Sequence, residues 1–134
     1  MTSTEDFWRI LLVEDDEDDY LIVRELLREI KGDQFDLHWV MHNGVTVELA
    51  CSGRFDVCLI DHHLGAITGF DFLDQIKASC KRAPVALMTG FLMPGVLETA
   101  LQRGAYAVLD KERITPRILE STVQEVIRLY RNDQ

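Results

Sequence analysis

The sequence has little positive charge and no long apolar stretch. Its 134 residues include 14 Lys and Arg against 23 Asp and Glu, and the formal net charge is −9. Such a chain is repelled by phosphate backbones and by anionic membrane surfaces, so we expect it to bind neither nucleic acid nor membranes. No apolar run approaches the ~18 residues that would indicate a membrane-spanning helix.

Cysteine and targeting signals are also scarce. The three cysteines, Cys51, Cys58 and Cys80, have no CxxC spacing of the kind that indicates a metal or redox motif. We interpret all three as small buried hydrophobic residues in a reducing cytoplasm. The N-terminal residues MTSTEDFWR lack the basic region and apolar stretch of a signal peptide, which also favours a cytoplasmic location.

Short β-rich runs alternate with segments of helical period along the chain. The runs are Arg9–Val13, Phe35–Met41, Asp56–Ile60, Pro84–Met88 and Tyr106–Leu109, and the alternating pattern of the second suits a sheet edge. Strict alternation of strands and helices predicts right-handed crossovers and a parallel sheet covered on both faces. The continuous apolar runs LLV, VCLI and VALM are typical of strands buried on both faces. Gly32 indicates the end of one helix, and Thr115-Pro116 indicates the start of another. The expected fold class is therefore α/β, a doubly wound (βα)5 arrangement. We see no linker, and expect a single domain over 1–134, with a core of about 9–130 and no effector domain.

Polar residues follow four of the predicted strands at the points where they end. Glu14 and Asp15 follow the first strand, Asp61 the third, Thr89 the fourth and Lys111 the fifth. In open α/β sheets, sites form beyond the carboxyl ends of the strands. Carboxylates from two strands make a hard, oxygen-rich site of the kind that suits Mg²⁺. A carboxylate beside Mg²⁺ and a lysine stays ionised and can attack a phosphoryl group.

Four motifs together resemble the receiver domain of response regulators, the CheY-like family of two-component signalling. RILLVEDD resembles the first strand and acidic pair of this family, DVCLIDHHLGAITGFDFL its phosphoacceptor segment, ALMTG its switch hydroxyl and AYAVLDK its lysine. Each motif alone is weak, but four in this order, each at a strand end, make a specific match. The resemblance implies a flavodoxin-like three-layer sandwich with the sheet order 2-1-3-4-5.

The resemblance also implies a role for each site residue. Asp61 is expected to be the phosphoacceptor, Thr89 the switch hydroxyl and Lys111 the phosphate contact. The expected ligands of Mg²⁺ (or Mn²⁺) are Glu14 through a bound water, Asp15, Asp61 and the backbone carbonyl of His63. Gly69 matches the family's glycine before the third helix.

The implied function is signalling by phosphorylation. A histidine kinase or histidine phosphotransferase would phosphorylate Asp61, and the domain would then switch conformation and dock on a protein target or pass the phosphoryl group along a phosphorelay. It would be no enzyme beyond its own phosphorylation and dephosphorylation. The expected docking face is that of the fourth helix, fifth strand and fifth helix, around Met93, Val96, Ala105 and Tyr106. We expect a bacterial, cytoplasmic monomer or phosphorylation-dependent dimer.

Several positions depart from the family pattern. Val108 stands where an aromatic switch residue is common, and Tyr106 would lie on the same side of the strand by its period of two. Glu112 replaces a proline after the lysine. Leu64-Gly65 replaces a Met-Pro pair after the acceptor and predicts a looser loop.

These departures leave other functions open. A phosphorylation-independent pseudo-receiver would use the same fold as an interaction module. A phosphatase with an aspartate nucleophile would need a second acid where His63 stands.

The acidic block from Glu14 to Asp19 has two further interpretations. Residues 16–19 fit the start of a helix, whose dipole favours anions, and we expect them to tolerate substitution. A calcium-binding loop would need glycine where Asp19 stands, and a helix instead of a strand before the block.

Overall fold

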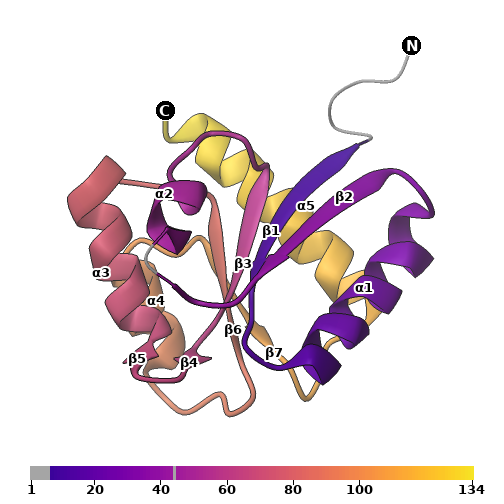
Figure 1. Cartoon of the computed structure of the whole chain (residues 1–134), viewed down its shortest axis with the longest axis horizontal. Helices are drawn as coiled ribbons and strands as arrows, with labels where there is room; N and C mark the ends of the chain where they lie inside the picture. The colour runs from indigo at the N-terminus through magenta and orange to yellow at the C-terminus, as the bar shows by residue number, and fades with distance from the viewer. Residues whose placement is uncertain (1–6, 44) are drawn as a thin grey trace.

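A five-stranded parallel sheet forms the middle of three layers in the computed structural model, which describes residues 7–43 and 45–134 (Figure 1). The strand order is β2-β1-β3-β6-β7, which confirms the predicted order of the five parallel strands. The strands are β1 (Trp8–Val13), β2 (Phe35–Val40), β3 (Val57–Asp61), β6 (Val85–Thr89) and β7 (Ala107–Asp110). Each boundary lies within one residue of its predicted position.

Helices cover both faces of this sheet, as the alternating pattern predicts. On one face lie α2 (Thr46–Ala50), α3 (Gly69–Cys80) and α4 (Val96–Gln102), and on the other lie α1 (Glu17–Lys31) and α5 (Pro116–Asn132) (Figure 1). No helix in the described part of the chain is both long and apolar enough to cross a membrane.

The core is divided in two by the sheet. Leu11 and Val13 of β1 pack in the cluster beneath α2, α3 and α4, whereas Ile10 and Leu12 pack in the cluster beneath α1 and α5. Successive side chains of a strand point to opposite faces, so a strand covered on both faces must be apolar throughout. The fully buried strands β3 and β6 follow the same rule.

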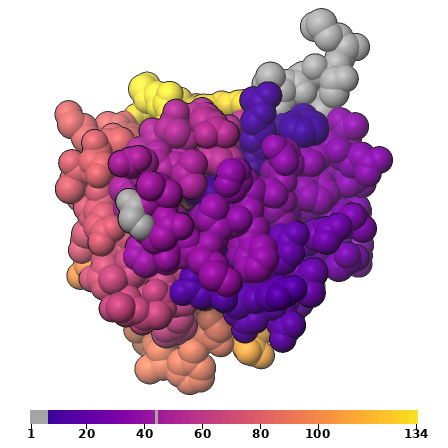
Figure 2. All heavy atoms as spheres, in the orientation of Figure 1, coloured from indigo at the N-terminus to yellow at the C-terminus, as the bar shows by residue number. Residues whose placement is uncertain are grey.

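The edge strand β2 is only partly covered. Its residues alternate between half-buried and exposed, and the space-filling view shows β2 and α2 at the front of the molecule (Figure 2). The alternating pattern of this segment therefore correctly indicated an edge position.

Helix ends carry the expected signals. Gly32 ends α1 with a positive φ of 60°, a conformation that glycine adopts without steric cost. Thr115 caps α5 by accepting a hydrogen bond from the N–H of Ile118, and Pro116 occupies the first turn.

The segment after Asp61 is more regular than the sequence suggested. It forms a two-stranded antiparallel hairpin, β4 (His63–Leu64) and β5 (Ile67–Thr68), turning at Gly65, whose φ is 73°. Backbone pairing thus orders a segment that no proline stiffens, and the looser loop stays a prediction.

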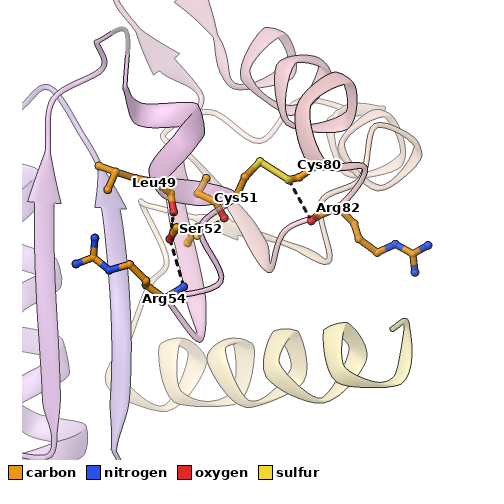
Figure 3. The surroundings of a disulfide bond; sticks show 8 residues. Leu49, Cys51, Ser52, Arg54, Cys80 and Arg82 are labelled. Atoms are coloured by element: carbon orange, nitrogen blue, oxygen red, sulfur yellow. Dashed lines mark hydrogen bonds between the residues drawn. A yellow bond between two sulfur atoms is a disulfide. The ribbon is translucent and has the colours of Figure 1, made fainter.

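The cysteines differ most from expectation. Cys51 and Cys80 form a disulfide between the ends of α2 and α3, and both are partly exposed (Figure 3). The prediction of three buried thiols holds only for Cys58. The two cysteines are 29 positions apart, and they meet because α2 and α3 pack side by side, which the spacing does not reveal.

Candidate functional site

The predicted site residues gather at the carboxyl edge of the sheet, at the lower end of Figure 1. Glu14 directly follows β1 and Asp61 ends β3, and their exposed fractions are only 1% and 5%. Thr89 ends β6, and Lys111 directly follows β7. The apolar strands bring these polar side chains to one edge of the sheet. Glu14, Asp61 and Lys111 border an open cleft of about 910 Å³ there, whereas Thr89 is buried beneath its lining.

Lys111 is the centre of the charged cluster. Its Nζ lies 2.9 Å from Glu14 Oε2, 3.2 Å from Asp61 Oδ1 and 2.7 Å from Asp19 Oδ2. One ammonium group therefore bridges three carboxylates that come from β1, β3 and the first turn of α1. Such a cation lowers the repulsion among carboxylates that would otherwise be costly to bury together.

The charged cluster perturbs the pKa values of Glu14 and Lys111. The pKa of Glu14 is raised from its ordinary value of 4.5 to about 7, mainly by burial and also by the charge of Asp61, although hydrogen bonding to Lys111 acts in the opposite direction. Burial lowers the pKa of Lys111, but its hydrogen bonds to Asp19 and Glu14 and the charge of Asp61 outweigh this and raise it well above its usual value. The lysine stays charged, and Glu14 is the strained acid of the cluster.

Backbone groups also hold Glu14 in place. Its Oε1 accepts a hydrogen bond from the N–H of Asp16 at 3.2 Å. Its carbonyl oxygen accepts one from Trp39 Nε1 at 2.7 Å, and Tyr20 stacks on the Trp39 ring with centroids 4.2 Å apart. The first acid of the block is thus fixed between β1, β2 and α1.

Asp15 is directed differently from its neighbour. It is exposed, and its Oδ1 accepts a hydrogen bond from the backbone N–H of His42, at 3.0 Å, in the loop between β2 and α2. Its Oδ2 points toward Gly65, where an added Cβ would lie 3.7 Å away. The structure therefore brings Glu14 and Asp61 together, and holds Asp15 on the adjoining loop.

Asp19 is the site residue that sequence reasoning missed. The carboxylates of Glu14, Asp19 and Asp61 have oxygens within 4.8 Å of one another, a group that could hold a metal ion. Asp19 does lie in the first turn of α1, as predicted, but it also pairs with Lys111, and its tolerance of substitution stays a prediction. Asp16 does cap α1, by accepting from the N–H of Asp18 at 2.8 Å. Asp19 lies three positions after Asp16, so one turn of the helix returns its side chain to the site. This spacing is a signal that could have been read from the sequence.

Thr89 is fully buried at the end of β6. Its hydroxyl accepts a hydrogen bond from the N–H of Phe91 and donates to the carbonyl of Phe91, both at 3.2 Å. Phe91 itself is 72% exposed. The hydroxyl thus supports the first turn of the loop before α4, next to the site.

Gly69 has a steric reason to be glycine. An added Cβ would lie 2.3 Å from Leu87 Cδ1 and 3.0 Å from the Cα of His62. The Gly69 N–H also donates to the carbonyl of His62 at 2.8 Å. A side chain here would push the start of α3 away from the acceptor segment.

His63 occupies the hairpin that follows the acceptor. Its backbone N–H donates to Asp61 Oδ1 at 3.3 Å, and it pairs with Thr68 across the hairpin. Its side chain is exposed, while burial lowers the pKa of His62 beside it. The hairpin therefore places the backbone of His63 next to the acceptor.

Tyr106 and Val108 lie on opposite faces of the sheet, contrary to the period-two prediction that placed them on the same side. Tyr106 sits in a bend before β7 and packs with the α1 and α5 cluster, whereas Val108 packs with the opposite cluster. The Tyr106 hydroxyl donates to Asp133 Oδ2 at 2.5 Å, at the end of α5. The backbone before β7 is not extended, so the alternation of sides does not reach back to Tyr106.

Comparison with known proteins gives a family match over most of the chain. Residues 10–123 match the family described as the response regulator receiver domain. A response regulator receiver protein of Anaeromyxobacter sp. strain Fw109-5 is 31% identical over 113 residues, which cover 84% of this chain and 46% of that protein. The chain thus spans about half the length of this relative.

Solved structures of similar fold include receiver domains. The receiver domain of a sensor histidine kinase from Pseudomonas aeruginosa PAO1, with a magnesium ion coordinated in its active-site cleft, is 26% identical, with a TM-score of 0.73 and coverage of 90% of this chain and 98% of that one. A chemotaxis protein of Vibrio cholerae, CheY4, is 22% identical with a TM-score of 0.72 and the same coverage of both chains, and this likeness concerns the fold alone.

Proposed function

Because the chain belongs to the family of response regulator receiver domains, we propose that it takes a phosphoryl group onto Asp61 from a histidine kinase or histidine phosphotransferase. The observation that carries this proposal is the placement of Asp61. Its carboxylate is almost fully buried at the carboxyl edge of the sheet, 3.2 Å from a charged lysine and open to a cleft. An aspartate with only a structural role would not need a neighbouring lysine or access to a cleft.

Each site residue has a part in the proposed reaction. An oxygen of Asp61 attacks the phosphorus atom, the bond to the donor's nitrogen breaks, and an acyl phosphate forms. Lys111 moves from the carboxylates to a phosphoryl oxygen and compensates its charge. Thr89 exchanges its bonds with Phe91 for a hydrogen bond to the phosphoryl group, which rearranges the loop before α4 and shifts the domain toward its active conformation.

The donor set fits Mg²⁺ or Mn²⁺. Hard carboxylate oxygens of Glu14, Asp19 and Asp61 converge within 4.8 Å, and such oxygens are the ligands that these ions prefer. We propose that Glu14, Asp15, Asp61 and the backbone carbonyl of His63 hold the ion, with Asp15 turning away from the N–H of His42 to take part. Bound there, the ion would neutralise charge on the phosphoryl oxygens.

The way in which the domain would signal follows from the same rearrangement of the loop before α4. We propose a receiver unit of about residues 9–130 that acts in the cytoplasm by docking on a protein target or by phosphorelay. Exposed apolar side chains on the loop before α4 and on α4 itself suit a docking surface, namely Phe91, Leu92, Met93, Leu97 and Leu101. Of the predicted docking residues, Ala105 is buried and Tyr106 is tied to α5, so α4 carries most of this face.

Incubation with Mg²⁺ and a small acyl phosphate, followed by intact-mass measurement, tests the proposal. We expect a gain of one phosphoryl group that is lost in Asp61→Asn and kept in Asp33→Asn, a control in the turn between α1 and β2. No gain in the wild type would indicate a phosphorylation-independent interaction module. Steady release of phosphate at a constant rate would indicate a phosphatase.

A further inference from the structure

A covalent link joins α2 and α3, two neighbouring helices on one face of the sheet. Cys51 directly follows α2 and Cys80 ends α3, with Cα atoms 5.9 Å apart, inside the range that a disulfide needs (Figure 3). Both sulfurs lie at the end of the molecule opposite Asp61, because α2 and α3 each start beside the carboxyl edge and run back. The link is therefore remote from the phosphoryl site.

The two helices differ greatly in their own stability. α3 has 12 residues and a capping box between Thr68 and Asp71, whereas α2 has only five residues and no side-chain cap at its start. A helix of one turn is not stable by itself. The disulfide thus ties a weak element to a strong one, and its closure fixes where α2 lies.

The sulfur atoms are placed for exchange with solutes. Cys51 and Cys80 are partly exposed, while Cys58 is buried and its pKa is raised by that burial to about 12. In a chain of net charge −9, the cysteines are bordered in sequence by exposed cations: Lys77, Lys81, Arg82 and Arg54. Figure 3 shows the guanidinium groups of Arg54 and Arg82 pointing away from the disulfide, so the access that exchange requires depends on the partial exposure of the two cysteines themselves.

We propose that Cys51 and Cys80 form a thiol–disulfide exchange site, whose closure under oxidising conditions fixes α2 against α3. The inference rests on the cytoplasmic location in the proposed function, since a disulfide in a reducing compartment is usually transient or redox-sensing. Reduction would leave two thiols, and the Cys80 sulfur lies 3.4 Å from the carbonyl oxygen of Arg82, a ready hydrogen-bond acceptor for the thiol.

The exchange needs only a low-molecular-weight disulfide such as oxidised glutathione. One cysteine thiolate attacks a sulfur of that disulfide, its S–S bond breaks, and a mixed disulfide and a free glutathione thiolate result. The second cysteine thiolate then attacks the sulfur of the first cysteine in the mixed disulfide, which forms the Cys51–Cys80 bond and releases the second glutathione thiolate. The two cysteines lose two electrons, the glutathione disulfide gains them, and the two thiol protons pass to solvent or to the released thiolates.

Equilibration of the whole protein in glutathione buffers of graded redox ratio, followed by alkylation in the folded state and mass measurement, tests the site. We expect two alkylated cysteines at the reducing end and none at the oxidising end, with one transition between them. Cys58 provides an internal control, because it should stay unmodified in the folded protein throughout. Cys51→Ser and Cys80→Ser should lose the transition, and Cys58→Ala should keep it.

Hydrogen exchange of α2 supplies a second measurement. In the disulfide form, the amides of Leu49 and Cys51, which bond to Val45 and Val47, should exchange at least several-fold more slowly than in the dithiol form. The proposal is overturned if the link never closes, if it stays closed in the most reducing buffer, or if α2 exchanges equally in both forms.

The thiol counts are independent of phosphorylation. Cys51→Ser should still gain a phosphoryl group on Asp61, and Asp61→Asn should still show the redox transition. Loss of one property without the other therefore identifies which of the two proposals has failed.

Discussion

The two edges of the sheet are held together in different ways. At the carboxyl edge, one lysine bridges three carboxylates, two of which are almost fully buried. At the amino edge, a disulfide joins α2 to α3, and the Arg82 guanidinium bonds to Asp133 at the end of α5. Carboxylates that share a single ammonium group can be rearranged by a ligand, whereas the link between α2 and α3 opens only when a covalent bond breaks.

The carboxyl edge is therefore suited to switching, and the amino edge is suited to supporting the fold. The same buried strands run between both edges, so their rigidity is shared. What differs is the chemistry that each edge places at the strand ends. Substitutions at each edge can show whether the two edges are as distinct as their contacts suggest.

The largest effect is expected at the carboxyl edge, from Lys111→Met. It leaves the buried carboxylates of Glu14 and Asp61 without their cation, so the free energy of unfolding should fall by about 3–5 kcal/mol near pH 8 in the absence of Mg²⁺. Near pH 5 the loss should be smaller, because Glu14, with a pKa of about 7, is then protonated in the folded state. Urea denaturation at both pH values measures this.

The control for this experiment is Lys81→Met, at an exposed lysine of the amino edge. It should change stability by less than about 0.5 kcal/mol. An equal loss for Lys111→Met at both pH values would contradict the role assigned to Glu14.

The next effect concerns the amino edge. Cys51→Ser should lower the stability of the oxidised protein by about 3 kcal/mol, since a disulfide across 29 positions limits the entropy of the unfolded chain. The same substitution should have little effect when wild type and variant are both kept reduced. Denaturant midpoints with and without reductant give the answer, and equal losses under both conditions would show that the cost comes from packing.

A pH effect of roughly 3 kcal/mol follows from Glu14. Its folded pKa, about 7, lies above its ordinary value of 4.5, so the folded state binds a proton that the unfolded state has already released. The contribution of Glu14 to stability should therefore be most favourable below about pH 4.5, fall as pH rises toward 7, and stay constant above that. Glu14→Gln should remove this slope from denaturation curves, and an unchanged slope would refute the assignment.

Asp19 and Asp18 offer a matched comparison within one helical turn. Asp19→Asn should cost about 1 kcal/mol, because its side chain is 34% exposed and solvent screens part of its ion pair with Lys111. It should also change the rate of phosphoryl uptake, since Lys111 loses one partner. Asp18→Asn should change neither by a measurable amount. Equal stability and equal rates of phosphoryl uptake in the two variants would mean that Asp19 acts only as a helix-start acid.

The smallest expected effect is a change in Mg²⁺ affinity at the carboxyl edge when the disulfide at the amino edge closes. The loop before α2 donates the His42 N–H to Asp15, so fixing α2 by the disulfide should hold Asp15 away from the ion. We expect Mg²⁺ to bind about threefold more weakly to the oxidised protein, or roughly 0.7 kcal/mol. Calorimetric titration of both redox forms measures this, with the Cys51→Ser, Cys80→Ser double variant as control. Equal affinities would mean that the edges act independently.

Much of this molecule could be predicted because local patterns determine local structure. Continuous apolar runs marked β3 and β6 as buried strands, and the alternating pattern of Phe35–Val40 marked the sheet edge. Thr115-Pro116 and Gly32 marked helix ends. Since parallel strands end at one edge, the same patterns also predicted that Glu14, Asp61 and Lys111 would meet.

The errors concern partners that lie far apart in the chain. Asp19 was taken for a surface acid because its cation, Lys111, is 92 positions away. Cys51 and Cys80 were taken for buried thiols because nothing in their spacing shows that two helix ends adjoin. Tyr106 was misplaced because a bend before β7 interrupts the alternation of sides.

The sequence by itself therefore determined the elements, their order and the edge at which the acids and the lysine gather. Hydrophobic period and glycine or proline signals act over a few residues, and they can be recognised in the chain without its fold. Only the tertiary structure decided that Asp19, and not Asp15, pairs with Lys111, and that two cysteines close a link at the opposite edge. Side-chain direction and the competition for one cation depend on distances through space, which the order of residues does not contain.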